Sequence, residues 1–148
     1  MFVKFYIIVV IIFSLTLSCT RKYTSPQEFK GKVLNIGSGG GFTGKSIQYS
    51  ILENGQLYEV LNDSSYLNLG EMDAVAVQQI FLNYSNFKFN ELKINDPGNR
   101  YYFIIDNFGS EKHKLTWGRN ELQSSTLEVF YNNAMGMITK HLKKNKND

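Results

Sequence analysis

A dense apolar run near the N-terminus, from Phe5 to Phe13, limits how much of this 148-residue chain can form a folded domain. The run follows a short basic start with Lys4 and gives way to smaller residues, which is the architecture of a secretory signal. It ends by Ser18, so it is shorter than the roughly 20 apolar residues that a membrane-spanning helix needs. The residues after Cys19 are enough for one domain with a single core and too few for two ordinary ones.

Cys19 is the only cysteine of the chain, and it directly follows the segment Leu15-Thr16-Leu17-Ser18. This segment resembles the end of a bacterial lipoprotein signal, as in small Bacteroidota lipoproteins, in which the cysteine after a short apolar box is lipidated. The resemblance implies a signal peptide over residues 1–18, a fatty-acyl group such as palmitate on Cys19, and a lipidated tether over residues 19–30. A plain signal peptide cut nearby would instead leave Cys19 as a free thiol. In both cases the chain lacks a second cysteine with which to form a disulfide.

The same resemblance implies a location. A lipid on Cys19 would attach the protein to a membrane of the bacterial cell envelope. The residues that follow, Arg21-Lys22, lack the acidic run that resembles a surface-export signal. A periplasm-facing position is therefore favoured over the cell surface.

The formal charge of +3 is carried by the two ends of the chain. Lys4, Arg21 and Lys22 lie near the N-terminus, and three lysines against one aspartate form the polar tail over residues 143–148. The stretch between them, residues 23–142, holds 10 of the 16 basic and 12 of the 13 acidic residues. A slightly acidic domain argues against a nucleic-acid-binding face, so no nucleic-acid partner is expected.

Strand patterns are clearest around Asn54-Gly55, which separates two β-rich runs over residues 46–53 and 56–61. This pair favours a two-residue type I′ turn, because both of its positions need positive φ. In that register Ile51 faces Tyr58, and one face of the hairpin carries the apolar side chains of Ile47, Tyr49, Ile51, Tyr58 and Val60. A first strand is expected over residues 33–36, and a second hairpin over residues 100–106 and 111–117.

Two amphipathic helices are predicted from apolar residues at helical spacing, one after Met72 and one ending near Leu142. Capping boxes are expected at Asn68 with Glu71 and at Ser125 with Glu128. The element order is then βββαββα. Such a chain most simply forms a single α+β domain over residues 31–142, with an antiparallel sheet of about five strands and both helices on one face.

A glycine-rich segment connects the first two predicted strands. It reads Gly39-Gly40-Gly41-Phe42-Thr43-Gly44-Lys45-Ser46 and matches the phosphate-binding pattern G-x-x-x-x-G-K-S. A phosphate loop opens a helix, whereas Ser46 is expected to open a strand, so nucleotide binding is not predicted. The glycines either form a sharply turned connection or serve recognition. In the second case the candidate partner-binding loop comprises Gly39, Gly40, Gly41, Phe42, Thr43 and Gly44, with Phe42 as an apolar anchor.

The five-residue motif Gly40 to Gly44, set before a hairpin, a helix, a second hairpin and a closing helix, is loosely similar to emfourin. Emfourins are small inhibitors of thermolysin-like metalloproteases. The resemblance spans roughly residues 33–142 and implies that the partner is a protease.

The sequence contains few residues of the types that act in catalysis or bind metals. His113 and His141 are the only histidines, and with Cys19 lipidated the domain has no cysteine nucleophile or soft metal ligand. The carboxylates at the second hairpin, Asp96, Asp106 and Glu111, are expected to form a solvated rim. We therefore predict no catalytic residue, no metal site and no cofactor.

Aromatic residues are frequent on the predicted strands, and Tyr101, Tyr102 and Phe103 are consecutive. Adjacent strand residues point to opposite faces, so part of this set must face away from the helices. Such an outer face either binds sugars or peptides, or is covered by an edge or by the N-terminal tether.

These observations favour a non-catalytic envelope protein that binds a macromolecular partner through the glycine loop or the outer sheet face. The alternative is a small envelope enzyme or small-ligand carrier with a cleft near His113 and Trp117.

Overall fold

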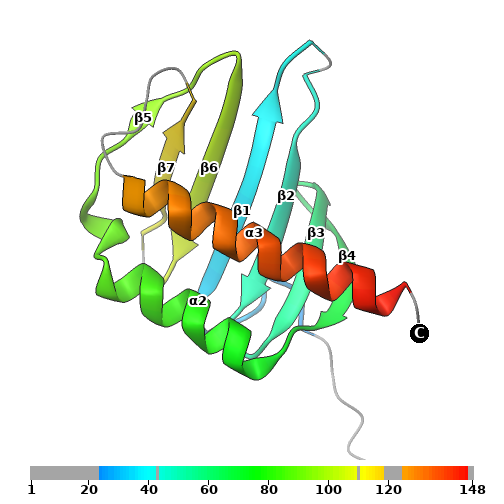
Figure 1. Ribbon diagram of the computed structural model, residues 1–148. Helices are drawn as coiled ribbons and strands as arrows, with labels where there is room; N and C mark the ends of the chain where they lie inside the picture. Colours follow the sequence, from blue (N-terminus) through cyan, green and yellow to red (C-terminus); the bar gives the residue numbers. More distant parts are fainter. Residues whose placement is uncertain (1–23, 43, 110, 119–124, 147–148) are drawn as a thin grey trace, which may run out of the picture.

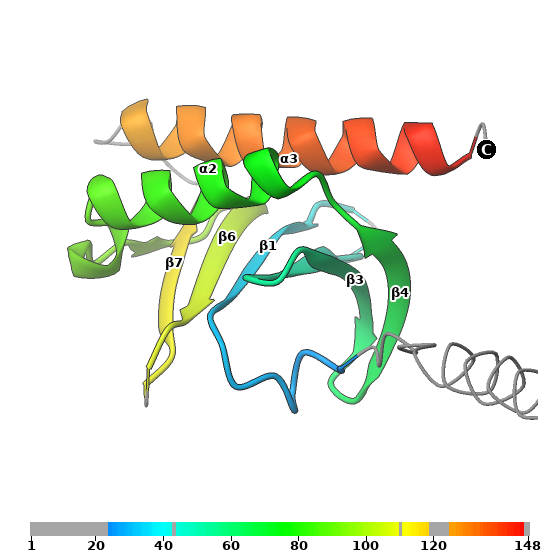
Figure 2. The same ribbon diagram turned by 90° about the horizontal axis from the view of Figure 1, so that it is seen from below.

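The computed structural model describes residues 24–42, 44–109, 111–118 and 125–146. These residues form an α+β fold in which two helices, α2 (Ala74–Asn86) and α3 (Ser125–Asn145), cover one face of a twisted sheet (Figures 1 and 2). The predicted signal peptide and Cys19 lie outside the described residues. Among the helices that the structure describes, none has the length and apolar character needed to cross a membrane.

The sheet has seven strands in the order β4-β3-β2-β1-β6-β7-β5. Neighbours pair antiparallel except β5 and β7, which run parallel, so the sheet is mixed. The strands are β1 (Val33–Gly40), β2 (Ile47–Leu52), β3 (Gln56–Asn62), β4 (Ser65–Glu71), β5 (Asn95–Asp96), β6 (Arg100–Asn107) and β7 (His113–Trp117). A short 3-10 helix, η1 (Phe89–Glu91), follows α2.

The prediction of two helices on one face is confirmed, whereas the five-strand prediction missed β4 and β5. Asn68 and Glu71 lie within β4 and do not cap a helix. The N-cap of α2 is Asp73, whose carboxylate accepts a hydrogen bond from the Ala76 amide at 3.1 Å. A short polar side chain at this position satisfies an amide that has no partner within the helix. The N-cap therefore lies five positions beyond the predicted one, Asn68.

The β2–β3 hairpin has a different turn from the predicted one. Gly55 has a φ of 97°, but Lys88 is the only described non-glycine residue with positive φ, so Asn54 lacks the conformation that a type I′ turn requires. The Gly55 amide donates to the Leu52 carbonyl, and the loop contains three residues instead of two. The register therefore shifts by one, and Ile51 pairs with Leu57.

This shift decides which side chains enter the core. Leu57 joins Ile51 beneath the helices, while Tyr58 turns to the opposite face of the sheet. The main core is the layer between the sheet and the two helices, and it includes the buried helical residues Val77, Ile80, Phe81, Tyr84, Leu127, Phe130, Tyr131, Ala134 and Ile138.

A smaller apolar cluster lies on the outer face of the sheet, away from the helices. It comprises Val33, Leu52 and Tyr58, with Phe29 and Tyr66 packed against them. Residues 24–32, which we call the N-terminal strap, cross this face (Figure 2).

Hydrogen bonds fix the strap to the sheet. The Tyr58 hydroxyl donates to the Thr24 carbonyl at 2.9 Å, and the Gln27 amide group donates to the Asp63 carbonyl at 2.7 Å. Pro26 is buried. Residues 24–30 of the predicted tether therefore pack on the outer face of the sheet, as in the alternative in which the tether covers that face. At the other end, α3 continues to Asn145, so the predicted polar tail is partly helical.

Candidate functional site

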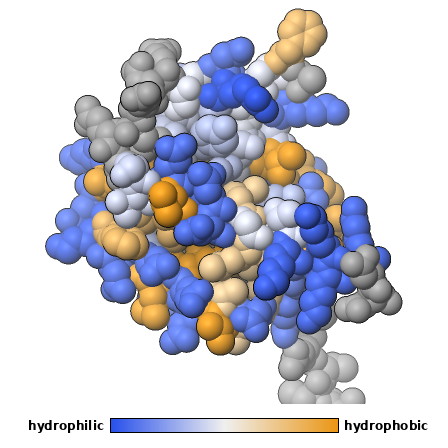
Figure 3. All heavy atoms as spheres, viewed as in Figure 1, coloured by the Kyte–Doolittle hydropathy of each residue, from blue (hydrophilic) through white to orange (hydrophobic). Residues whose placement is uncertain are grey.

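The glycine loop lies at one end of the sheet, between β1 and β2 (Figure 1). The Gly41 amide donates to the Asn99 carbonyl at 2.6 Å, and the Gly44 amide donates to the Gly41 carbonyl at 3.2 Å. Phe42 between them is fully exposed, and an apolar side chain protrudes from this end of the molecule (Figure 3). Thr43 lies outside the described residues. The tip of the loop therefore presents an aromatic ring to solvent from a base that is fixed to the neighbouring β5–β6 connection.

The glycines before the tip have a different role, because they lie within β1, which was expected to end before Gly37. Gly37 pairs with Phe103 and Gly39 pairs with Tyr101 on β6. A Cβ atom on Gly37 would lie 2.5 Å from the Phe103 ring, and one on Gly39 would lie 2.7 Å from the Tyr101 ring. The two rings thus cover the backbone of β1 at positions where only glycine leaves room.

This arrangement also accounts for part of the predicted outer aromatic face. Phe103 is buried against β1, and the Lys114 ammonium lies 5.7 Å from the centroid of its ring. Tyr102 points to the opposite face, where its ring lies 5.3 Å from that of Tyr131 on α3. Of the six residues in the candidate loop, Gly39 and Gly40 therefore belong to β1 and leave no room for a side chain. A recognition role stays open for the tip.

The phosphate-binding pattern does not form the corresponding structure. The segment that contains Lys45 and Ser46 leads into β2, which is a strand antiparallel to β1. A phosphate loop needs a helix whose N-terminal amides converge on the ligand. The segment after Gly44 does not supply such a helix.

A buried polar cluster, formed by Tyr84, Asp106 and His113, was not predicted. Asp106 is only 4% exposed, so its expected place on a solvated rim is wrong. The Tyr84 hydroxyl donates to Asp106 Oδ2, and His113 Nδ1 lies 3.1 Å from the same oxygen. His113 Nε2 lies 2.7 Å from the Leu92 carbonyl oxygen. The cluster connects α2, β6, β7 and the segment after η1.

Hydrogen-bond chemistry limits the proton positions in this cluster. The Leu92 carbonyl can only accept, so His113 Nε2 carries a proton. His113 Nδ1 then meets Asp106 either as an imidazolium donating to a carboxylate or as a neutral ring accepting from a carboxylic acid. Burial raises the pKa of Tyr84, and the hydrogen bond to Asp106 and the Asp106 charge raise that pKa further. Tyr84 therefore stays protonated at neutral pH and acts as a donor.

The side chains of this cluster are bonded to one another, which is the arrangement of a structural hydrogen-bond network. Both nitrogens of His113 have protein partners, and neither Tyr84 nor Asp106 is accessible to a substrate. Trp117 is also buried, with its ring against Tyr102 and Tyr131. At Trp117, packed aromatic side chains occupy the place of the cleft that the alternative function requires, whereas His113 is partly exposed.

The other polar candidates are dispersed. His141 Nε2 lies 2.8 Å from the Leu69 carbonyl oxygen, Asp96 lies in β5, and Glu111 is exposed. Within residues 24–146, apart from the undescribed gaps, no three metal-binding side chains gather. A separate apolar groove of about 390 Å³ lies between α2 and α3, beside the exposed side chains of Phe87 and Val129. Sequence periodicity did not indicate this groove, because both residues lie outside the buried helical stripes.

Compared with models of known protein families and with curated protein sequences, the chain has no match.

Proposed function

We propose that the protein is a lipid-anchored, non-catalytic component of the bacterial cell envelope that binds another macromolecule through the tip of the glycine loop. The observation that carries this proposal is Phe42, a fully exposed aromatic ring on a short turn. Aromatic side chains that enter a partner's pocket are frequent hot spots of protein interfaces. A fixed base reduces the entropy lost on binding.

The loop has the features of such a preorganised element. Its first strand, β1, lies in the middle of the sheet between β2 and β6, and its base is tied to Asn99. Of the partner classes, a protease is the one that the resemblance to emfourin suggests. A projecting turn of this kind suits insertion into a concave active site.

Phe42→Ala is expected to reduce partner binding at least tenfold, because loss of an aromatic hot spot costs about 2 kcal/mol or more. Its unfolding free energy should change by less than about 0.5 kcal/mol, since the ring has no packing to lose. In the first measurement, the immobilised chain that starts at Thr20 captures partners from envelope extract, and mass spectrometry identifies them. In the second, the same chain is titrated against a thermolysin-like metalloprotease and the residual protease activity is measured.

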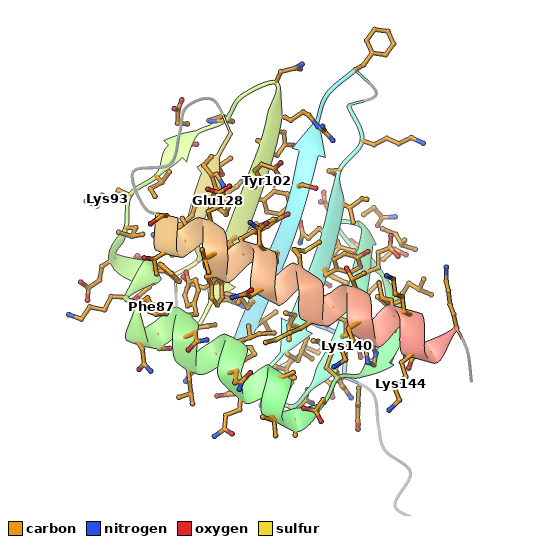
Figure 4. The ribbon with its side chains drawn as sticks, viewed as in Figure 1. Phe87, Lys93, Tyr102, Glu128, Lys140 and Lys144 are labelled. Carbon is orange, nitrogen blue, oxygen red and sulfur yellow. The ribbon has the colours of Figure 1, made fainter. Side chains whose placement is uncertain are left out.

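The matched control is Phe87→Ala, which removes the same side chain from the helix face, where Phe87 is 54% exposed (Figure 4). This control should retain binding. If Phe42→Ala instead destabilised the protein by several kcal/mol and left partner capture intact, the loop would have a structural role only.

The anchor is tested separately. Metabolic labelling with an alkynyl fatty acid should mark the full chain and not Cys19→Ala, because Cys19 is the only cysteine available for lipidation. The measurement is in-gel fluorescence after attachment of a dye to the alkyne. Equal labelling of the two proteins would contradict the lipoprotein assignment.

A further inference from the structure

Four lysines cluster at the C-terminal end of α3: Lys140, Lys143 and Lys144 lie in its last turns, and Lys146 directly follows it. All four side chains are exposed, and Lys140 and Lys144 project from the same end of the helix (Figure 4). None of the four forms an ion pair among the described residues. We call these four lysines the basic end of α3.

The fold brings the basic end of α3 to the same edge of the sheet as the start of the described chain. His141 and Asn145 hydrogen bond to the Leu69 carbonyl of β4, the edge strand. Thr24 is bonded to Tyr58 of β3, whose strand partner on β4 is Asn68. Figures 1 and 2 both show this edge beside the C-terminal end of α3.

Acidic side chains near the basic end of α3 offset only part of its charge. Glu71 and Asp73 from neighbouring elements line a cavity of about 620 Å³ together with Lys140 and Lys144. The Asp73 carboxylate is already bonded to the N-terminus of α2. Glu59, the strand partner of Leu67, and the exposed Asp63 add two carboxylates on the adjoining hairpin, so the excess of positive charge is confined to the end of α3.

Two exposed leucines belong to the hairpin at the same edge. Leu61 is 58% exposed near the end of β3, and Leu67 is 49% exposed on β4. A surface that combines several lysines with exposed apolar side chains is suited to the interface of an anionic bilayer, where the lysines meet headgroups and the apolar side chains enter the acyl boundary.

We propose that the basic end of α3, with Leu61 and Leu67, docks the domain onto an anionic phospholipid surface. This inference rests on the proposed function in one respect, since lipid on Cys19 would hold the domain close to such a surface. A single acyl chain gives only marginal membrane binding, and a basic patch is a typical second signal. Docking would fix the orientation of the anchored domain.

The test uses the chain from Thr20 to Asp148, which has no lipid and contains the whole described fold with both hydrophobic clusters. Its binding is measured by co-sedimentation with vesicles of phosphatidylglycerol and phosphatidylcholine, and with phosphatidylcholine vesicles alone. Binding to the anionic vesicles should weaken steeply with added salt, because exposed charges are screened. Replacing Lys140, Lys143, Lys144 and Lys146 together by glutamine should lower the partition coefficient at least about tenfold.

The matched control replaces four exposed lysines near the other edge of the sheet: Lys88, Lys93, Lys112 and Lys114. Lys93, for example, lies beyond the far end of α3 (Figure 4). This variant has the same net charge as the first and should bind within about twofold of the wild type.

Three results would overturn the proposal: no binding of the wild type to anionic vesicles, equal loss in the two variants, or binding to heparin without binding to vesicles. The last would assign the surface to a polyanion other than lipid. Because neither the acyl group nor a protein partner is present in this assay, its failure leaves the labelling and Phe42 experiments unaffected. Failure of those experiments would likewise leave the vesicle result unchanged.

Discussion

Asp106→Ala is expected to lower the free energy of unfolding by about 3–5 kcal/mol, because it leaves the buried Tyr84 hydroxyl and the partly buried His113 without their partner. Tyr84 would lose the acceptor of its hydroxyl, and His113 would lose the oxygen that faces Nδ1. Tyr84 is fully buried, so water would not replace the lost acceptor without disturbing the packing. Urea denaturation of the chain that starts at Thr20 measures the effect.

Tyr84→Phe provides a milder companion, since it removes one hydrogen bond and keeps the pair of Asp106 and His113. It should cost about 1–3 kcal/mol. Glu111→Ala is the control for loss of a carboxylate at the same hairpin, and its exposed position predicts a change within about 0.5 kcal/mol. Similar midpoints for Asp106→Ala and Glu111→Ala would show that the buried cluster does not stabilise the fold.

Gly40→Ala should destabilise the protein by roughly 2–5 kcal/mol, from two causes that act together. Its φ of 86° lies in the region that costs a residue with a Cβ about 1–2 kcal/mol. Its added Cβ would also lie 2.1 Å from the Asn99 carbonyl oxygen, and relief of such an overlap requires a backbone shift that costs about 1–3 kcal/mol. Thermal and urea unfolding both report this loss.

Gly44→Ala separates the two causes. Gly44 also has a positive φ, of 62°, but nothing lies within 4 Å of its added Cβ. Only the conformational cost of about 1–2 kcal/mol is expected there. If the two alanine variants lost equal stability, the close contact between β1 and the Asn99 carbonyl would be energetically unimportant.

The helices could be predicted from the sequence because their apolar spacing is directly visible. Val77, Ile80, Phe81 and Tyr84 form one stripe, and all four are buried as expected. The sheet was harder to predict, since its register depends on turn geometry. The pair Asn54-Gly55 indicated a hairpin at the right place, but one additional loop residue moved Tyr58 from the predicted core face to the outer face.

The candidate site, too, could be predicted from the sequence only in part. The glycine pattern located a loop with an exposed Phe42, but the partners of Gly37 and Gly39 are about 64 positions further along the chain, on β6. Asp106 was placed on a solvated rim because it follows an aromatic strand near a turn. Only the tertiary contact with Tyr84, which comes from α2, explains why a carboxylate is buried there.

The N-terminal strap limits how far the domain could move away from the membrane if Cys19 carried a lipid. Thr24 is bonded to the sheet, so only five residue steps separate the described fold from Cys19. Fully extended, these steps span at most about 18 Å. With so short a tether, a domain anchored through Cys19 would stay close to the bilayer. Its effective concentration for binding the membrane or a membrane-bound partner would then be high. Partners farther from the bilayer would have to extend towards it to be bound.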